Sequence, residues 1–221
     1  MKIILFGASG MIGQGVLREC LLDPSVDSVL SVSRAPIPQK HPKLRELITP
    51  NLGDLSSFES QLSGFDACFF SLGATAVGSS EENYRRINYE LPVAAATFLA
   101  KLNPQMTFVY VSGRGTDSTE KGSAMWARVK GTTENALLRL PFKGAYMFRI
   151  GAVIPLHGIK SKTPLYNFFY TVGAPLTFLL RRFSPQSMQT TEEVGKAMLT
   201  VAKRGAPKSI LETADIYNLL R

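Results

Sequence analysis

Short apolar runs alternate along the chain with segments in which apolar residues recur every three or four positions. The runs are typical of buried parallel strands, and the three-to-four spacing is typical of helices. The apolar runs predict strands at residues 2–6, 28–33, 44–49, 66–71, 107–111, 145–150 and 209–212. The helical spacing predicts helices at residues 12–22, 56–62, 81–102, 124–140, 165–182, 191–203 and 214–220. This alternation predicts a doubly wound parallel α/β sheet with right-handed crossovers.

The connection between the first strand and the first helix carries three glycines, Gly7, Gly10 and Gly13. The first lets the chain turn out of the strand, the second lets a pyrophosphate approach the backbone, and the third lets the helix pack close to the strand. The N–H groups and positive dipole end of the helix would attract the phosphates. The spacing is GxxGxxG instead of the dehydrogenase GxGxxG, but its strand–turn–helix context indicates dinucleotide binding. The alternative is an ordinary βα turn.

The second strand ends at Ser33 and Arg34. Folds that bind NAD place an acidic residue near this point for the ribose 2′-hydroxyl, whereas an arginine suits the 2′-phosphate of NADP. No acidic residue ends this run, so the sequence favours NADP(H), with a solvated strand-end arginine as the alternative. Farther along, Asp54 either caps a helical turn or accepts a hydrogen bond from an adenine amino group. Gly73 follows the fourth predicted strand and again permits a close approach of the cofactor.

The composition narrows the class of protein. A chain of 221 residues suffices for one α/β domain, and we expect residues 1–221 to form it, with residues 151–221 on the substrate side. Cys20 and Cys68 fall in a helix and a strand pattern, which indicates no disulfide framework or metal site and fits a reducing, cytoplasmic location. The formal net charge is +8, but the basic residues are scattered and no nucleic-acid motif accompanies them, so we expect no nucleic-acid partner.

Residues 164–180 carry no charge, and Arg181 and Arg182 follow them. The segment is at the short limit for a membrane span, and Gly173 and Pro175 interrupt it. We expect a helical cap over the substrate pocket or a contact in a homodimer, with a membrane-surface helix as the alternative. A segment of this kind lining the pocket would favour an apolar or aromatic substrate.

Seven short motifs occur in a recognisable order. They are GASGMIG at 7–13, SR at 33–34, GDL at 53–55, SLGA at 71–74, VSG at 111–113, VKGTTE at 129–134 and FRIGAVIP at 148–155. Over residues 1–155 the chain resembles the atypical, epimerase/dehydratase-like branch of the short-chain dehydrogenase/reductase superfamily, in particular its Tat-interacting-protein oxidoreductase-like members. The resemblance implies a Rossmann-like fold that binds NADP(H) through Gly7, Ser9, Gly10, Met11, Ile12, Gly13, Ser33, Arg34, Asp54, Leu55, Leu72, Gly73, Ala74, Lys130, Ile150 and Val153.

The family's catalytic set is a serine, a tyrosine and a lysine, with the tyrosine one helical turn before the lysine. The resemblance implies that Ser112 orients the substrate oxygen and that Lys130 binds the nicotinamide ribose and lowers the pKa of the acid. The tyrosine position holds Trp126, whose indole N–H donates a hydrogen bond but does not titrate. Either another residue, water or Lys130 supplies the proton, or hydride transfer is not fast. The other candidate donors are Tyr84, Tyr89, Tyr110, His157 and Tyr166.

The sequence therefore predicts an NADP-dependent oxidoreductase or epimerase-like enzyme that acts on a small, apolar carbonyl or alcohol. The alternative is a redox-silent NADP-binding regulatory or scaffold protein. The two hypotheses share the cofactor site and differ at Trp126.

Overall fold

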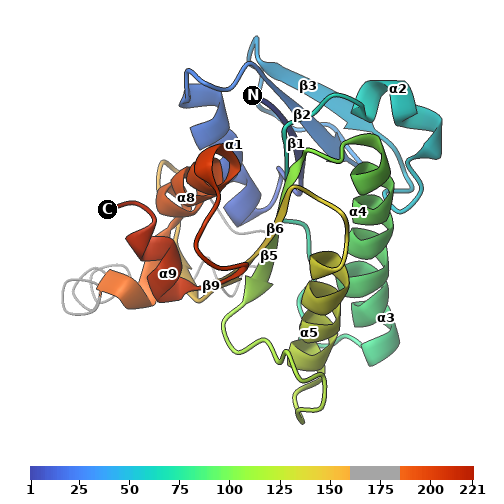
Figure 1. Cartoon of the computed structure of the whole chain (residues 1–221), viewed down its shortest axis with the longest axis vertical. Helices are drawn as coiled ribbons and strands as arrows, with labels where there is room; N and C mark the ends of the chain where they lie inside the picture. The colour runs from blue at the N-terminus through green and yellow to red at the C-terminus, as the bar shows by residue number, and fades with distance from the viewer. Residues whose placement is uncertain (160–184) are drawn as a thin grey trace.

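The computed structural model describes residues 1–159 and 185–221, and a parallel sheet lies at the centre of this part of the chain (Figure 1). The seven strands follow the order β3-β2-β1-β4-β5-β6-β9. They are β1 (Lys2–Phe6), β2 (Ser28–Ser33), β3 (Leu44–Ile48), β4 (Ala67–Phe70), β5 (Thr107–Gly113), β6 (Gly144–Ile150) and β9 (Ile210–Glu212). All neighbouring strands are parallel, so the predicted doubly wound α/β fold is confirmed.

Helices cover both faces of the sheet (Figure 1). One side carries α1 (Met11–Leu22), α8 (Thr191–Arg204) and α9 (Thr213–Asn218), and the other carries α2 (Glu59–Leu62), α3 (Glu81–Arg85), α4 (Leu91–Leu102) and α5 (Met125–Leu138). Successive residues of β1 point to opposite faces, so Ile3 joins the apolar cluster under α1 and α8 while Ile4 joins the one under α4 and α5. Two cores therefore hold the sheet between two helical layers.

The helix predicted at residues 81–102 is interrupted by a π-helical segment, Arg86–Glu90 (η2), between α3 and α4. Pro92 follows this segment in the first turn of α4, and because proline has no N–H it cannot donate to the carbonyl of Asn88, four residues earlier. The segment buries Asn88, whose carbonyl accepts hydrogen bonds from the Tyr110 hydroxyl at 3.2 Å and the Thr133 hydroxyl at 2.7 Å. The wide turn thus ties this helical arm to β5 and α5.

A second, two-stranded parallel sheet pairs β7 (Ala152–Ile154) with β8 (Met188–Thr190). Neither of these strands is among those that the sequence predicts, so this small sheet is a correction to the predicted fold. Short 3₁₀ turns complete the described elements at Ser56–Phe58 (η1) and Pro185–Ser187 (η3). The predicted helix at residues 165–182 and the apolar segment 164–180 lie outside the described residues, so the predictions of a cap, a dimer contact or a membrane-surface helix stay predictions. In the described ranges no helix has the length and apolarity that crossing a membrane requires.

Candidate functional site

The turn from β1 into α1 is shaped by its three glycines. Gly7 adopts a φ of +84°, and a Cβ added there would lie 2.7 Å from the backbone nitrogen of Leu72. A Cβ added at Gly13 would lie 2.0 Å from the carbonyl oxygen of Gly7, whereas one added at Gly10 would meet only that same oxygen, at 3.4 Å. Gly7 and Gly13 are therefore required by the fold itself. The space beside Gly10 is otherwise open.

That open space adjoins the N-terminus of α1. Gly10 is the N-cap residue, no side chain of the described residues caps the first turn, and no acidic residue lies in it. The first N–H groups of the helix therefore remain for a ligand, and together with the helix dipole they favour an anion. Met11 and Ile12 continue the turn and pack partly against the core. The predicted Gly7–Gly13 turn thus fits a pyrophosphate.

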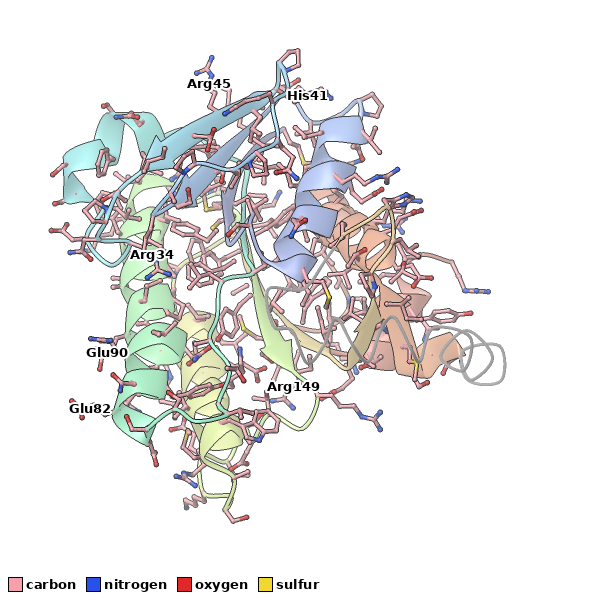
Figure 2. All side chains as sticks on the ribbon, turned by 180° about the vertical axis from the view of Figure 1, so that it is seen from behind. Arg34, His41, Arg45, Glu82, Glu90 and Arg149 are labelled. Atoms are coloured by element: carbon pink, nitrogen blue, oxygen red, sulfur yellow. The ribbon has the colours of Figure 1, made fainter. Side chains whose placement is uncertain are left out.

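A pocket of about 470 Å³ opens at the ends of β2 and β4 and against η2 and α4, and one of its lining residues, Leu72, lies against Gly7 of the turn. Leu52, Gly53 and Leu72 contribute to its lining. Arg34 and Arg86 also line it and are both exposed, and neither side chain makes a hydrogen bond or ion pair with any residue that the structure describes. Figure 2 shows Arg34, which follows β2, on the side of the molecule where Glu90 of η2 also lies. The pocket therefore offers apolar walls together with two cations.

Several side chains predicted to bind the cofactor are used within the fold. Asp54 accepts hydrogen bonds from the backbone N–H of Ser56 at 3.1 Å and from the Ser56 hydroxyl at 2.7 Å, which closes a turn just before η1. Ser33 donates its hydroxyl proton to the carbonyl of Ala35 at 2.7 Å. Apolar residues of the predicted set lie buried in the core: Leu55, Ile150 and Val153. Their contact with a cofactor stays a prediction.

Lys130 of α5 lies where the ends of β4 and β5 meet. Its ammonium group donates to the Tyr110 hydroxyl and to the Val111 carbonyl, each at 3.3 Å. A Cβ added at Gly73 would lie 4.0 Å from the Lys130 Nζ, so the ammonium also faces the Gly73–Ala74 loop. Burial lowers the pKa of Lys130 to about 8, and the charge of Glu134, one turn later, opposes this shift.

Trp126 lies one helical turn before Lys130 and packs against the turn that follows β5. A Cβ added at Gly113 or at Gly115 would lie 3.5 Å from the indole ring. Gly115 has a φ of +88°, which a residue with a side chain rarely adopts. The indole is half-buried, so one part of it remains open at this edge of the sheet. It can donate a hydrogen bond there, but it cannot exchange a proton.

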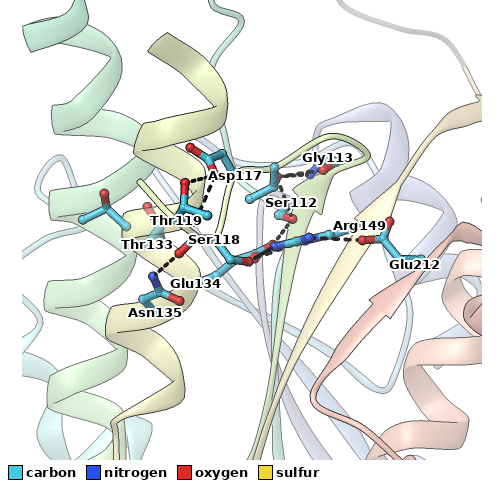
Figure 3. A network of polar contacts seen from close by, with 12 residues as sticks. Ser112, Gly113, Asp117, Ser118, Thr119, Thr133, Glu134, Asn135, Arg149 and Glu212 are labelled. Carbon is cyan, nitrogen blue, oxygen red and sulfur yellow. Dashed lines mark hydrogen bonds and ion pairs between the residues drawn. The ribbon is translucent and has the colours of Figure 1, made fainter. Parts of the chain in front are cut away.

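Ser112 points into a buried polar network (Figure 3). It is 5% exposed, and its hydroxyl donates to the carboxylate of Glu134. Arg149 donates to both oxygens of Glu134 at 2.6 to 3.2 Å, and it also donates to Glu212 at 3.1 Å. Sequence reasoning missed Glu134 and Arg149, although both fall in the quoted VKGTTE and FRIGAVIP motifs. The available signal was the spacing of Glu134, four residues after Lys130 and hence on the same helix face.

The other candidate proton donors lie in varied surroundings. Tyr84 and Tyr110 are buried, and burial raises the pKa of Tyr84 to about 12 and that of Tyr110 further. Tyr89 stacks under the guanidinium of Arg85 at 4.2 Å, and His157 binds Glu192 at 2.8 Å. Of these four, Tyr110 alone contacts Lys130, and its hydroxyl donates to the Asn88 carbonyl. Tyr166 lies outside the described residues.

A metal centre has no set of ligands in the described ranges, because no group of three or more His, Cys, Asp and Glu side chains gathers there. Cys20 and Cys68 are both buried free thiols, and burial raises the pKa of each. The polar chemistry of this part of the chain is therefore that of the glycine turn, the two-arginine pocket and the Ser112 network.

Comparison with known proteins yields distant relatives. No protein-family model matches the chain. It is 33% identical over 124 residues to the leucinostatins biosynthesis cluster protein T of Purpureocillium lilacinum, a match that spans 54% of this chain and 45% of that protein. It is 24% identical over 213 residues to the mitochondrial protein FMP52 of Candida albicans, spanning 93% of this chain and 89% of that protein.

The names of these relatives correct the predicted cytoplasmic location. The FMP52 proteins of Candida albicans, Aspergillus terreus and Eremothecium gossypii are all named mitochondrial, and this finding contradicts the prediction. The prediction failed because it was drawn from two unpaired cysteines. Free thiols report the redox state of a compartment and do not identify the compartment.

Solved structures resemble the chain over nearly its whole length. The Bordetella bronchiseptica enzyme WbmF in complex with NAD⁺ has a TM-score of 0.68 at 16% identity, covering 99% of this chain and 76% of that one. The UDP-glucuronic acid 4-epimerase of Bacillus cereus in complex with NAD has a TM-score of 0.67 at 12% identity, covering 96% and 78%. The chain thus has the Rossmann-like fold of these NAD-bound enzymes, which is the fold that its resemblance to the atypical short-chain dehydrogenase/reductase superfamily predicts.

Proposed function

We propose that this chain binds a nicotinamide dinucleotide and acts as an oxidoreductase or epimerase-like enzyme on a small carbonyl or alcohol. The observation that carries the proposal is the open space beside Gly10, next to the uncapped N-terminus of α1. The NAD-bound structures with the same fold support it. The pyrophosphate would lie over Gly10, and the adenosine end would enter the 470 Å³ pocket.

The cofactor proposed is NADP(H). Arg34 and Arg86 line the pocket without an ionic partner among the described residues, and a 2′-phosphate would give each a partner. A carboxylate at the end of β2, which would suit the 2′-hydroxyl of NAD, is absent from the stretch Ser28–Ser33 and from Arg34 after it. Glu90 lies at the same pocket and would oppose the phosphate in part.

The dinucleotide, when bound, supplies hydride transfer at its nicotinamide ring. Lys130 would hold the nicotinamide ribose, and the position of its ammonium opposite Gly73 at the end of β4 supports this role. Trp126 would orient an oxygen by donating its N–H. The redox-silent alternative has its own supporting observation, because among the described residues the one phenol that contacts Lys130, that of Tyr110, is buried.

The test is a titration of the purified chain with NADPH and with NADH, followed by the fluorescence of Trp126, the only tryptophan. We expect quenching, tighter binding of NADPH, and an approximately tenfold weaker affinity for NADPH in Arg34→Ala and Arg86→Ala, which corresponds to about 1.4 kcal/mol. Arg45→Ala is the matched control, because Arg45 is an exposed β3 residue remote from Arg34 (Figure 2).

If neither NADPH nor NADH binds, the proposal is overturned. Tighter binding of NADH would overturn its NADP(H) component alone. A panel of small aldehydes, ketones and alcohols then separates the two functional classes. Net consumption of NADPH or reduction of NADP⁺ supports an oxidoreductase, and inversion of a carbinol centre without net change in the cofactor supports an epimerase-like enzyme. Tight binding with neither outcome on the whole panel supports the redox-silent protein.

A further inference from the structure

Glu134 stands between two groups of the proposed site. It is fully buried on α5, four residues after Lys130 and therefore on the same helix face. Its carboxylate receives three N–H contacts from Arg149 on β6 and the hydroxyl of Ser112 on β5 (Figure 3). One buried charge thus contacts the candidate serine and lies one turn from the candidate lysine.

The hydrogen bonds fix the direction in which the Ser112 hydroxyl can act. A carboxylate that accepts from a guanidinium is ionised and only accepts, so Ser112 must donate its single proton to Glu134. The Thr116 hydroxyl donates its proton to the Gly113 carbonyl at 2.7 Å, and this oxygen is closer to it than the Ser112 hydroxyl, which lies at 3.3 Å. While this network holds, Ser112 can only accept a hydrogen bond from a further group.

Charge is the second route by which Glu134 acts. The ammonium of Lys130 faces the Tyr110 hydroxyl of β5, and Tyr110 lies near Tyr84 of α3. Burial raises the pKa of both phenols, so both stay neutral. Among the described residues Glu134 is therefore the charged group that favours the ammonium form of Lys130, and its carboxylate is itself paired with Arg149, which also binds the more exposed Glu212.

We propose that Glu134 is a positioning residue that fixes Ser112 as a hydrogen-bond acceptor and holds Lys130 as a cation. Its significance for turnover rests on the proposed function. The inference itself concerns groups of the free protein and is tested without cofactor. Failure of nucleotide binding would therefore leave this test intact, and failure of this test would leave nucleotide binding intact.

The experiment measures the titration midpoint of Lys130 by competitive acetylation, with the modified peptide quantified by mass spectrometry across a range of pH. We expect Glu134→Gln to lower the midpoint by about half a pH unit or more, because an amide retains the hydrogen bond but removes the charge. Glu212→Gln is the matched control, since it removes the other carboxylate bound to Arg149, and we expect no shift there. An unchanged midpoint in Glu134→Gln, or an equal shift in Glu212→Gln, would overturn the proposal.

A purely structural role for Glu134 predicts lost stability without a change in the Lys130 midpoint. Circular dichroism and the thermal midpoint check that each variant is folded. Where Glu134→Gln unfolds, the same charge is removed in the step from Arg149→Gln to the Glu134→Gln, Arg149→Gln double variant. The Lys130 midpoint must fall in that step as well, and an unchanged midpoint there refutes the inference.

Discussion

Replacing single glycines of the β1–α1 turn separates what the fold requires from what the ligand requires. In Gly13→Ala the new Cβ would lie 2.0 Å from the Gly7 carbonyl oxygen and 2.6 Å from its carbon, both backbone atoms. In Gly10→Ala the nearest atom is the same oxygen at 3.4 Å, an ordinary contact, and the φ of −81° suits alanine. Two substitutions of one methyl group, three residues apart, should therefore have different effects.

The loss of stability in Gly13→Ala depends on how far α1 can move to remove the steric overlap. Real Cβ contacts lie beyond 3.0 Å, so α1 would have to move by about 1 Å relative to β1. Such a shift is opposed by α8, because α1 already packs so closely that a Cβ at Gly15 would lie 2.6 Å from Thr191. We expect a loss of about 3 kcal/mol or more in the free energy of unfolding, equivalent to about 6–12 °C in Tm for a chain of this size.

Urea denaturation followed by circular dichroism, without nucleotide, measures this loss. Gly10→Ala should remain within about 1 kcal/mol of the parent chain, because its Cβ enters open space. In the NADPH titration the order reverses. Gly10→Ala should lose at least about tenfold in affinity, because its methyl group occupies the path of the pyrophosphate. Equal stability of the two variants, or unimpaired NADPH binding by Gly10→Ala, would refute the reasoning.

Two further predictions concern the buried charges. Folding lowers the pKa of Lys130 to about 8, below about 10.4 in the unfolded chain, so the ammonium form opposes folding. Urea titrations should therefore show Lys130→Met to be more stable than the parent chain by about 1–2 kcal/mol near pH 7. This gain in stability should fade as the pH rises from about 8 to about 10.5. A gain independent of pH would contradict this assignment. Arg149→Met should lower the free energy of unfolding by about 3–5 kcal/mol, because it leaves the buried Glu134 carboxylate without its ion-pair partner. The double variant Arg149→Met, Glu134→Met should lose less stability, because it removes both charges. Thermal unfolding measures both losses, and equal losses would contradict the prediction.

Most strands of the main sheet could be predicted because they carry runs of apolar residues, of which Ala67–Phe70 is the most continuous. The small sheet could not, because β8 (Met188–Thr190) carries no apolar run and the three residues of β7 pair with it alone. The π-helical segment also depends on distant groups, since its buried Asn88 is held through Tyr110 and Thr133. The sequence near Asn88 does not indicate which distant residues will bind it.

The candidate site shows the same division. Backbone features, such as the Gly7–Gly13 turn, follow from local sequence, because a missing Cβ acts where it stands in the chain. The direction of a side chain depends on the strand's alternation, and this rule was available for Ser112. Phe108, Tyr110 and Ser112 share one face of β5, and the first two are core residues. The alternation therefore aims Ser112 inward, where Glu134 receives its proton.

The two halves of the candidate site differ in how their charges are satisfied. At the adenosine end Arg34 and Arg86 have no ionic partner among the described residues, so a phosphate can bind there without breaking an existing pair. At the other end Arg149 and Glu134 satisfy each other, and Ser112 has already committed its proton. Binding of a dinucleotide therefore requires little rearrangement, whereas proton transfer requires a donor outside this closed network. We therefore expect Arg34→Ala to act on cofactor affinity at the adenosine end, whereas Glu134→Gln should act at the nicotinamide end through Ser112 and Lys130.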